Sequence, residues 1–272
     1  MITHEYIIQV SKSRDTYFLV YLADLHNGTK NFDEDRCKKL ISWIAAKPWA
    51  YWIGGGDYCE AITVKDKRFD PNAIHPKYID KLGDIITAEY NDVRDLLKPI
   101  AGKCIGLHLG NHEDTIYREY SRDIVNELCE DLSTTNLGAS AMTRLKFMEG
   151  KKEIYSCVVH SEHGHMSGRK PGGKVNSIED KSKYFNADIF FEGHSHDKIC
   201  HSNILLSLAP KVTGGPRDLV ATKRVFGITG SFFRTYQVGA ESYAEKKGYP
   251  PSTLGVVRVS IDPYKGDIHI SQ

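Results

Sequence analysis

The chain has 272 residues, of which 40% are hydrophobic and 26% charged, a composition that is ordinary for a globular protein and excludes disordered and fibrous classes. With 36 basic and 35 acidic residues its formal net charge is +1, so it lacks the overall positive charge of a dedicated nucleic-acid-binding protein. No apolar run approaches the ~18 residues of a membrane-spanning helix, and no signal-peptide pattern is present. We therefore expect a cytoplasmic protein with no membrane partner.

Five β-rich runs, each ending in Gly, Asp or His, alternate with helical patterns, which is typical of α/β proteins. The runs lie at residues 16–24, 49–57, 103–112, 153–164 and 187–196. Helices are predicted at residues 33–46, 78–97 and 117–132, and a polar helix near 177–184. The first of these helices carries acidic residues in its first turn, where they favour a helix.

Two further stretches complete the prediction of one α/β domain over residues 1–272. Residues 63–76 contain Lys65, Lys67, Arg68 and two prolines without clear periodicity, so we expect a long surface loop. After residue 196 the chain is mostly strand-like, which implies a second sheet packed on the first. These later strands are expected at residues 204–209, 223–233, 254–262 and 267–271.

Residues of the kind that bind metals stand at the C-terminal end of each of the five early strand-like runs. In open α/β sheets these ends meet at a crevice, so side chains far apart in sequence can converge there. In chain order they are Asp24 and His26, Asp57, Asn111 and His112, then His160, His163 or His165, and finally His194 and His196.

This mixture of ligand types predicts first-row transition metals. Imidazoles combined with a few carboxylates and one amide oxygen suit Mn²⁺, Fe or Zn²⁺, whereas a shell made only of oxygen atoms would suit Mg²⁺ or Ca²⁺. A carboxylate can bridge two ions ~3.5–4 Å apart, and such a pair polarises a phosphoryl oxygen and lowers the pKa of a shared water. The chemistry expected from these residues is attack of hydroxide on a phosphoester.

The order and spacing of five motifs resemble those of calcineurin-like metallophosphoesterases. The motifs are DLH at 24–26, GGD at 55–57, GNHE at 110–113, HG at 163–164 and GHSH at 193–196. The tail, with GSF at 230–232 and residues 242–255, is similar to phage-type and prophage-type members. The resemblance implies a four-layer α/β/β/α sandwich of two mixed sheets.

The resemblance also implies a role for each residue. Asp24, His26 and His196 would hold a first metal ion and Asp57 would bridge, while Asn111, His194 and the histidine of the fourth motif would hold a second ion. Mn²⁺ is the expected metal, with Fe, Zn²⁺ or Ni²⁺ as alternatives. His112 would be the general acid, oriented by Glu60. In related protein phosphatases an aspartate and then an arginine stand where this chain has Glu60 and Ala61, a departure that weighs against a protein phosphatase.

The fourth motif leaves three candidates, because His160, His163 and His165 lie close together. We choose His163, since it directly precedes the glycine that opens a glycine-rich turn at 164–174, as in relatives. His160 and His165 remain alternatives.

The predicted activity is hydrolysis of phosphodiester or phosphomonoester bonds by a metal-bridging hydroxide, on nucleotides or nucleic-acid ends. The alternatives are a protein or small-molecule phosphatase, a nuclease acting on polymers, and a catalytically silent binding module on the same fold. The near-neutral charge weighs against a polymer nuclease, which usually needs a basic or aromatic platform. The oligomeric state cannot be predicted from this sequence.

Overall fold

The computed structural model describes residues 1–11, 16–165, 168, 170–208 and 218–272. The predicted glycine-rich turn at 164–174, and the end of the strand predicted at 204–209, lie partly outside these residues. The loop predicted at 63–76 has no helix or strand up to residue 75, and a 3₁₀ helix begins at Pro76.

Twelve strands of the described chain form two mixed six-stranded sheets. The first sheet has the order β1-β6-β7-β8-β10-β9, made from Ile2–Gln9, Ser140–Glu149, Lys152–Glu162, Ile189–Glu192, Leu219–Ile228 and Ile199–Leu208. The second sheet has the order β12-β11-β2-β3-β4-β5, made from Asp267–Ser271, Val257–Asp262, Tyr17–Leu22, Ala50–Gly54, Cys104–His108 and Asn136–Gly138. Each sheet contains both parallel and antiparallel pairs.

The expectation of two packed mixed sheets is confirmed, but the strands are shared between them differently from the prediction. The late strands do not form a sheet of their own: β9 and β10 extend the first sheet beside β8, and β11 and β12 extend the second beside β2. Strand pairing across the chain is decided by which apolar faces meet, and strand periodicity alone does not encode it.

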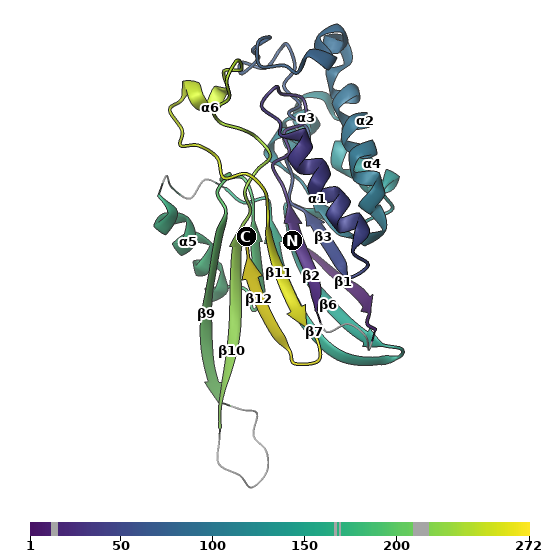
Figure 1. Cartoon of the computed structure of the whole chain (residues 1–272), viewed down its shortest axis with the longest axis vertical. Coiled ribbons are helices and arrows are strands. Elements are labelled where there is room, and N and C mark those ends of the chain that lie inside the picture. The colour runs from purple at the N-terminus through teal and green to yellow at the C-terminus, as the bar shows by residue number, and fades with distance from the viewer. Residues whose placement is uncertain (12–15, 166–167, 169, 209–217) are drawn as a thin grey trace.

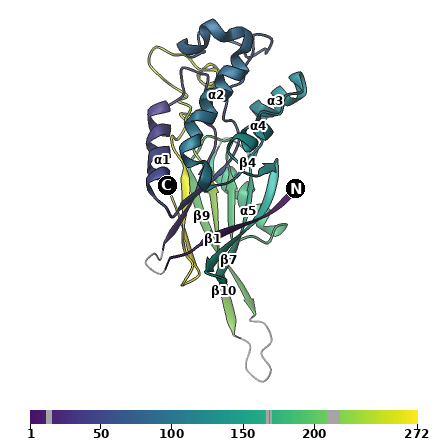
Figure 2. The same ribbon diagram turned by 90° about the vertical axis from the view of Figure 1, so that its right-hand side faces the viewer.

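Helices cover the outer face of each sheet, which confirms the four-layer arrangement (Figures 1 and 2). Apolar side chains between the sheets form one core, and those between the second sheet and its helices form another. The helices over the second sheet include α1 (Glu34–Ala46), α2 (Ile85–Leu97) and α4 (Ile124–Asp131). On the first sheet, α5 (Pro171–Asp180) packs through Ile178 against Phe190 and Phe226.

Three helix predictions need correction. The helix expected at 117–132 is two helices, α3 (Asn111–Tyr120) and α4, because Ser121 takes a left-handed conformation with φ 54° and Asp123 caps the next helix. The helix expected at 78–97 begins as a 3₁₀ helix, Pro76–Asp84, before α2. The polar helix near 177–184 begins earlier, at Pro171, and ends in a 3₁₀ turn, Lys181–Lys183. The remaining helix, α6, is one turn at Tyr243–Lys246.

The fold brings the C-terminal ends of β2, β3, β4, β7 and β8 to one end of the sandwich. Each of these strands stops within four residues of a predicted ligand. Among the described residues, no helix is both long and apolar enough to span a membrane.

Candidate metal centre

The backbone at these strand ends is held in an uncommon conformation. Eight non-glycine residues in the described chain have positive φ, and five of them are predicted ligands: Asp24, His26, Asp57, His194 and His196. A left-handed conformation is unfavourable for side chains other than glycine, so its concentration at one place indicates a functional constraint. Gly110 is required for the close approach of two loops, because a Cβ there would lie 2.1 Å from the Asp57 nitrogen.

Asp24, His26 and His196 form the first group of converging ligand atoms. Nε2 of His26 lies 3.1 Å from Nε2 of His196, which in turn lies 3.5 Å from Oδ1 of Asp24. Asp24 is fully buried and its other oxygen accepts a hydrogen bond from the His194 backbone at 2.9 Å. One carboxylate oxygen and two imidazole nitrogens are therefore directed at one point.

Asp57, His163 and His194 form the second group. Nε2 of His163 lies 3.1 Å from Oδ1 of Asn111, 3.2 Å from Nδ1 of His194 and 3.4 Å from Oδ2 of Asp57. The same Oδ2 atom of Asp57 lies 3.9 Å from Nε2 of His26 in the first group. The Asp57 carboxylate thus stands between the two groups.

Hydrogen bonds fix the orientation of two of the imidazoles. Nδ1 of His26 lies 2.9 Å from the Glu60 carboxylate, and Nδ1 of His163 lies 2.7 Å from the Gly55 carbonyl. With Nδ1–H donating to an oxygen, the lone pair of Nε2 is directed into the cluster. This carboxylate or carbonyl partner is typical of metal-binding histidines.

Of the three candidates in the fourth motif, the structure brings His163 to the cluster. His160 is buried in β7, where its ring stacks on Phe185 at a centroid distance of 4.3 Å. His165 is exposed and belongs to neither group. That His163 binds a metal stays a prediction.

The electrostatics of the cluster favour positive charge. Burial raises the pKa of Asp57, but the His163 and His112 imidazoles overcome this and hold that pKa well below its usual value. Burial lowers the pKa of His163, whereas Asp57 and Asp24 raise it, to about 10. A site where carboxylates hold a proton on a buried imidazole is also a site that stabilises a cation.

The residues present fit a pair of divalent cations. Oδ1 of Asp24 is buried and has no hydrogen-bond partner within the described chain, an expensive state for a carboxylate oxygen unless a cation faces it. The Nε2 atoms of His26 and His196 face one another with at least one lone pair between them. Imidazole, carboxylate and amide donors together suit Mn²⁺, Fe, Zn²⁺ or Ni²⁺.

His112 lies beside the cluster, at the start of α3, and belongs to neither of these two ligand groups. Its backbone N–H donates to Oδ1 of Asp57 at 3.0 Å, and its ring stands edge-on to His26 with centroids 4.8 Å apart. Nδ1 of His112 hydrogen-bonds to the main-chain carbonyl of Glu60. Glu60 therefore contacts both imidazoles: its backbone carbonyl orients His112, and its carboxylate hydrogen-bonds to His26, a contact that the sequence did not predict.

Glu113 positions the Asp57 loop and was given no role from the sequence. Its carboxylate accepts hydrogen bonds from the backbone nitrogens of Asp57, Tyr58 and Cys59, at 2.9, 2.7 and 3.0 Å. Glu113 is the last residue of the GNHE motif, and its position next to His112 is the sequence feature from which a role near the site could have been predicted. A buried carboxylate that satisfies three donors in one turn holds Asp57 in its left-handed conformation.

A cavity of about 300 Å³ opens above the cluster. His26, Asp57, Asn111, His112, His194 and His196 line its floor, and Phe233, Tyr243 and Tyr249 line a wall from the C-terminal segment. Arg68 enters from the predicted loop: Asp66 holds its Nη2 at 2.7 Å, and Nη1 lies 3.5 Å from Nε2 of His112. A cationic group therefore lines the cavity beside the cluster.

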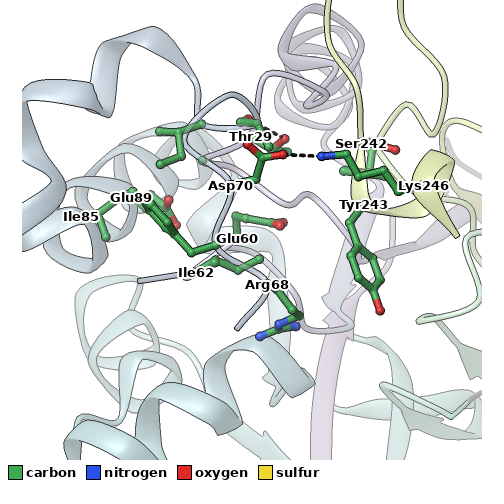
Figure 3. A pocket seen from close by; sticks show the side chains of 15 residues that line it. Thr29, Glu60, Ile62, Arg68, Asp70, Ile85, Glu89, Ser242, Tyr243 and Lys246 are labelled. Carbon is green, nitrogen blue, oxygen red and sulfur yellow. Dashed lines mark hydrogen bonds and ion pairs between the residues drawn. The ribbon is translucent and has the colours of Figure 1, made fainter. Parts of the chain in front are cut away.

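A smaller pocket of about 80 Å³ adjoins this cavity through Glu60, Ile62, Arg68 and Tyr243 (Figure 3). An ion pair between Asp70 and Lys246, 2.5 Å long, joins the 63–75 loop to α6 across it. Lys174 also lines the larger cavity, where Asp197 holds its Nζ at 2.6 Å. Arg68 is paired with a carboxylate too, but its Nη1 lies 3.5 Å from His112 beside the cluster, which makes it the better placed of the two cations.

No protein-family model matches the chain, and no curated protein sequence matches it. Several solved structures are similar over most of their length. Calcineurin-like phosphoesterase YfkN from Bacillus subtilis is 13% identical, with 94% of this chain and 88% of that chain covered and a TM-score of 0.43. GAP50, the anchor in the inner membrane complex of Plasmodium, is 10% identical with the same coverage and a TM-score of 0.45. Nuclease MPE from Pseudomonas putida is 11% identical, with 93% and 87% covered and a TM-score of 0.33. At this identity and these TM-scores, none of them assigns an activity to this chain.

Proposed function

We propose that this chain is a dinuclear-metal-dependent phosphoesterase that hydrolyses phosphodiester or phosphomonoester bonds, with residues 1–272 acting as one domain. The observation that carries the proposal is the position of the Asp57 carboxylate, whose Oδ2 atom lies 3.9 Å from one ligand group and 3.4 Å from the other. Two groups of ligand atoms, with one carboxylate of the second group also close to the first, form the pattern of a two-metal site.

Asp24, His26 and His196 would hold one ion, and Asn111, His163 and His194 the other, with Asp57 shared. Mn²⁺ is the metal we favour, because the donors mix nitrogen with hard oxygen ligands. When bound, such ions polarise a phosphoryl oxygen and make water a strong nucleophile at neutral pH.

The residues of the chain itself then bind the substrate and move a proton. Arg68 is placed to hold a phosphate oxygen at the mouth of the cavity, since its Nη1 faces the cluster and Asp66 fixes its orientation. His112 is placed to donate a proton from Nε2 to the leaving-group oxygen, because its Nδ1–H is bonded to the Glu60 carbonyl and the substrate would take the place of Arg68 Nη1, which lies 3.5 Å from Nε2.

A nucleotide or a nucleic-acid end is the substrate class that we favour. Besides Arg68, the cavity is lined by a wall of aromatic and proline side chains from the C-terminal segment: Phe233, Tyr243, Tyr249, Pro250 and Pro251. Such a wall suits a planar base attached to the phosphate, and base–aromatic stacking tolerates any base.

The decisive experiment combines metal analysis with a hydrolysis panel. Protein stripped of metal and reloaded with Mn²⁺, Fe²⁺, Zn²⁺ or Ni²⁺ should retain about two ions per chain and hydrolyse at least one of an aryl monoester, an aryl diester, a cyclic nucleotide and end-labelled DNA or RNA. Two bound ions without hydrolysis of any substrate would instead identify a binding module.

Three alanine variants provide matched controls for the ligand assignment. His163→Ala should lose one of the two ions, while His160→Ala and His165→Ala, changes of the same kind within five residues, should keep both. A structure-wide effect would lower metal content in all three. Loss confined to His160→Ala or His165→Ala would overturn the placement of the second ion.

A further inference from the structure

The helix α5 and the 3₁₀ turn that follows it carry two lysines with buried side chains. Lys174 and Lys181 are seven residues apart, a spacing that places them on one face of a helix, and their side chains are 6% and 13% exposed. Lys183, two residues further on, is 66% exposed and pairs with Asp180 of α5. Lysine is almost never buried unless its ammonium group is paired, so the partners of the two buried lysines indicate what they do.

Lys181 lies between the ends of β7 and β8. Its Nζ forms ion pairs with Oε1 of Glu162, the last residue of β7, and with Oε1 of Glu192, the last residue of β8. The two strands are parallel neighbours in which Ser161 pairs with Phe191, so the two glutamates are the next pair in this register. Carboxylates side by side on adjacent strands repel each other, and an ammonium group shared between them removes the repulsion.

These two strand ends lead directly to two of the predicted metal ligands. His163 follows Glu162, and His194 comes two residues after Glu192. The distance of 3.2 Å between Nε2 of His163 and Nδ1 of His194 therefore depends on how closely the strand ends approach. Without Lys181 two facing carboxylates would remain unbalanced, and that of Glu192 is almost fully buried. The strand ends should then move apart and carry the two imidazoles with them.

Lys174 holds the loop that follows β8. Its Nζ donates to the main-chain carbonyl of Ser195 at 3.2 Å and to the Asp197 carboxylate at 2.6 Å. Ser195 lies between His194 and His196, which both have left-handed backbones, with φ angles of 62° and 53°. Such conformations are costly and persist only where surrounding contacts fix them. Lys174 supplies one of these contacts from α5.

We propose that Lys174 and Lys181 are positioning residues for metal binding, which hold the late ligand histidines in place from α5. An ammonium group has no lone pair to offer a cation, so both lysines act through the segments that they hold. Lys181 acts on His163 and His194, two ligands of the second ion. Lys174 acts on the loop from His194 to His196, which carries one ligand of each ion. The inference rests on the ligand assignment of the proposed function.

Titration of the metal-free protein with Mn²⁺ tests the inference. Lys181→Met should weaken one of the two ions roughly tenfold or more and change the other by less than about twofold, whereas Lys174→Met should weaken both. Lys181→Arg keeps the charge and should restore most of the affinity. The matched control is Lys183→Met, at the exposed lysine of the same turn, which should bind both ions as wild type does.

Imidazole ¹⁵N spectra of the metal-free protein provide a readout that needs no bound ion. Lys181→Met should shift the signals of His163 and His194 and leave that of His26, which Glu60 holds at the other ion site. Lys183→Met should shift none of them. A general loss of stability would not select two histidines in this way.

A double variant covers the case in which Lys181→Met does not fold. Lys181→Met combined with Glu192→Gln removes one buried charge of each sign, and it should show the same shifts because the ends of β7 and β8 still lack their link. Wild-type affinity for both ions with unshifted imidazole signals would overturn the inference, and so would equal weakening of both ions in Lys181→Met or the same loss in Lys183→Met. If the wild-type chain bound no Mn²⁺, the proposed function would fail, and the metal-free spectra would still decide whether Lys181 positions the two imidazoles.

Discussion

The two ends of the first sheet differ in which kind of residue departs from the usual pattern of burial. One end has buried charged residues and the other has exposed apolar residues. Where β7 and β8 end, His163 and the residues of GHSH enter a cluster with buried carboxylates such as Asp24 and Asp57. At the opposite end, residues 204–208 of β9 and 219–222 of β10 form a projecting arm (Figure 1), where Leu206 and Leu219 are more than half exposed. Buried polar groups and exposed apolar patches are the informative exceptions in a protein, and this sheet has one at each end.

The exceptions at the two ends differ in kind. Strain, buried charge and unsatisfied ligand atoms concentrate at one end, where positive φ angles cluster at the predicted ligands. At the other end the exception is exposed apolar side chains. Substitutions at the cluster should therefore change metal binding and the proposed activity, whereas substitutions of the exposed leucines should change neither.

The largest effect is expected from Asp57→Asn. A neutral amide is a poor bridge between two cations, so metal content should fall below two ions per chain and activity should drop to that of metal-stripped protein. Metal analysis and kcat on the best substrate measure both effects, with the surface variant Asp95→Asn as the control. Full activity with both ions bound would remove Asp57 from the centre of the site.

His112→Ala should lose about 100-fold to 10,000-fold in kcat while it keeps both ions. An aryl leaving group of low pKa needs little protonation and should suffer less than a ribose leaving group. The comparison of kcat for the two substrates, with metal content checked, separates proton transfer from metal binding. Equal losses on both substrates, or missing metal, would mean that His112 is a ligand or a support.

His108 extends the comparison, because it is a buried histidine at the end that carries the candidate metal cluster, and its two nitrogens already have partners. They lie 2.9 Å from the Gly138 carbonyl and 2.8 Å from the Ser161 hydroxyl. Burial lowers its pKa from 6.5 to about 4, although the Gly138 hydrogen bond opposes this. The unfolded chain therefore binds more protons as pH falls below 6.5, and stability is lost progressively toward pH 4.

A shift of this size corresponds to about 3 kcal/mol between neutral pH and pH 4. Urea unfolding of wild type and His108→Gln across this range should show a shallower pH dependence in the variant. Parallel curves would show that His108 does not titrate in this way.

Glu60→Gln should lower metal affinity by roughly 10-fold to 100-fold, the usual cost of removing the partner of a metal-binding histidine. An effect on metal affinity is not expected if Glu60 acts only through His112. It is expected here because the Glu60 carboxylate hydrogen-bonds to Nδ1 of His26. Titration with Mn²⁺ measures it, and kcat at saturating Mn²⁺ should recover most of the loss. A fall in kcat that saturating metal does not restore would return Glu60 to the role predicted from sequence.

The fold class and the convergence of the candidate ligands could both be predicted from the sequence. The seven candidates follow strand ends within four residues, a local pattern, and the structure brings them together, although metal binding by them stays a prediction. The hydrogen bonds of Glu113 to the Asp57 loop and the contact of Glu60 with His26 depend on how separate loops meet in space. The spacing of motifs along the sequence does not predict such contacts. The arm was missed for the same reason: residues 204–208 resemble any buried strand, and only the end of the second sheet exposes them.

The smallest effect is expected at the arm, where leucine can be compared with leucine in one sheet. Leu145 of β6 is fully buried between the sheets, so Leu145→Ala should lower the free energy of unfolding by ~2–5 kcal/mol. Leu206→Ala should change it by less than ~0.5 kcal/mol, because its side chain leaves little contact to lose within its own chain. Urea unfolding at a concentration where the protein sediments as a monomer keeps assembly out of the measurement. A loss of more than ~1 kcal/mol in Leu206→Ala would show that the arm packs against its own chain. The apolar face would then be part of the core, and the contrast between the two ends of the sheet would fail.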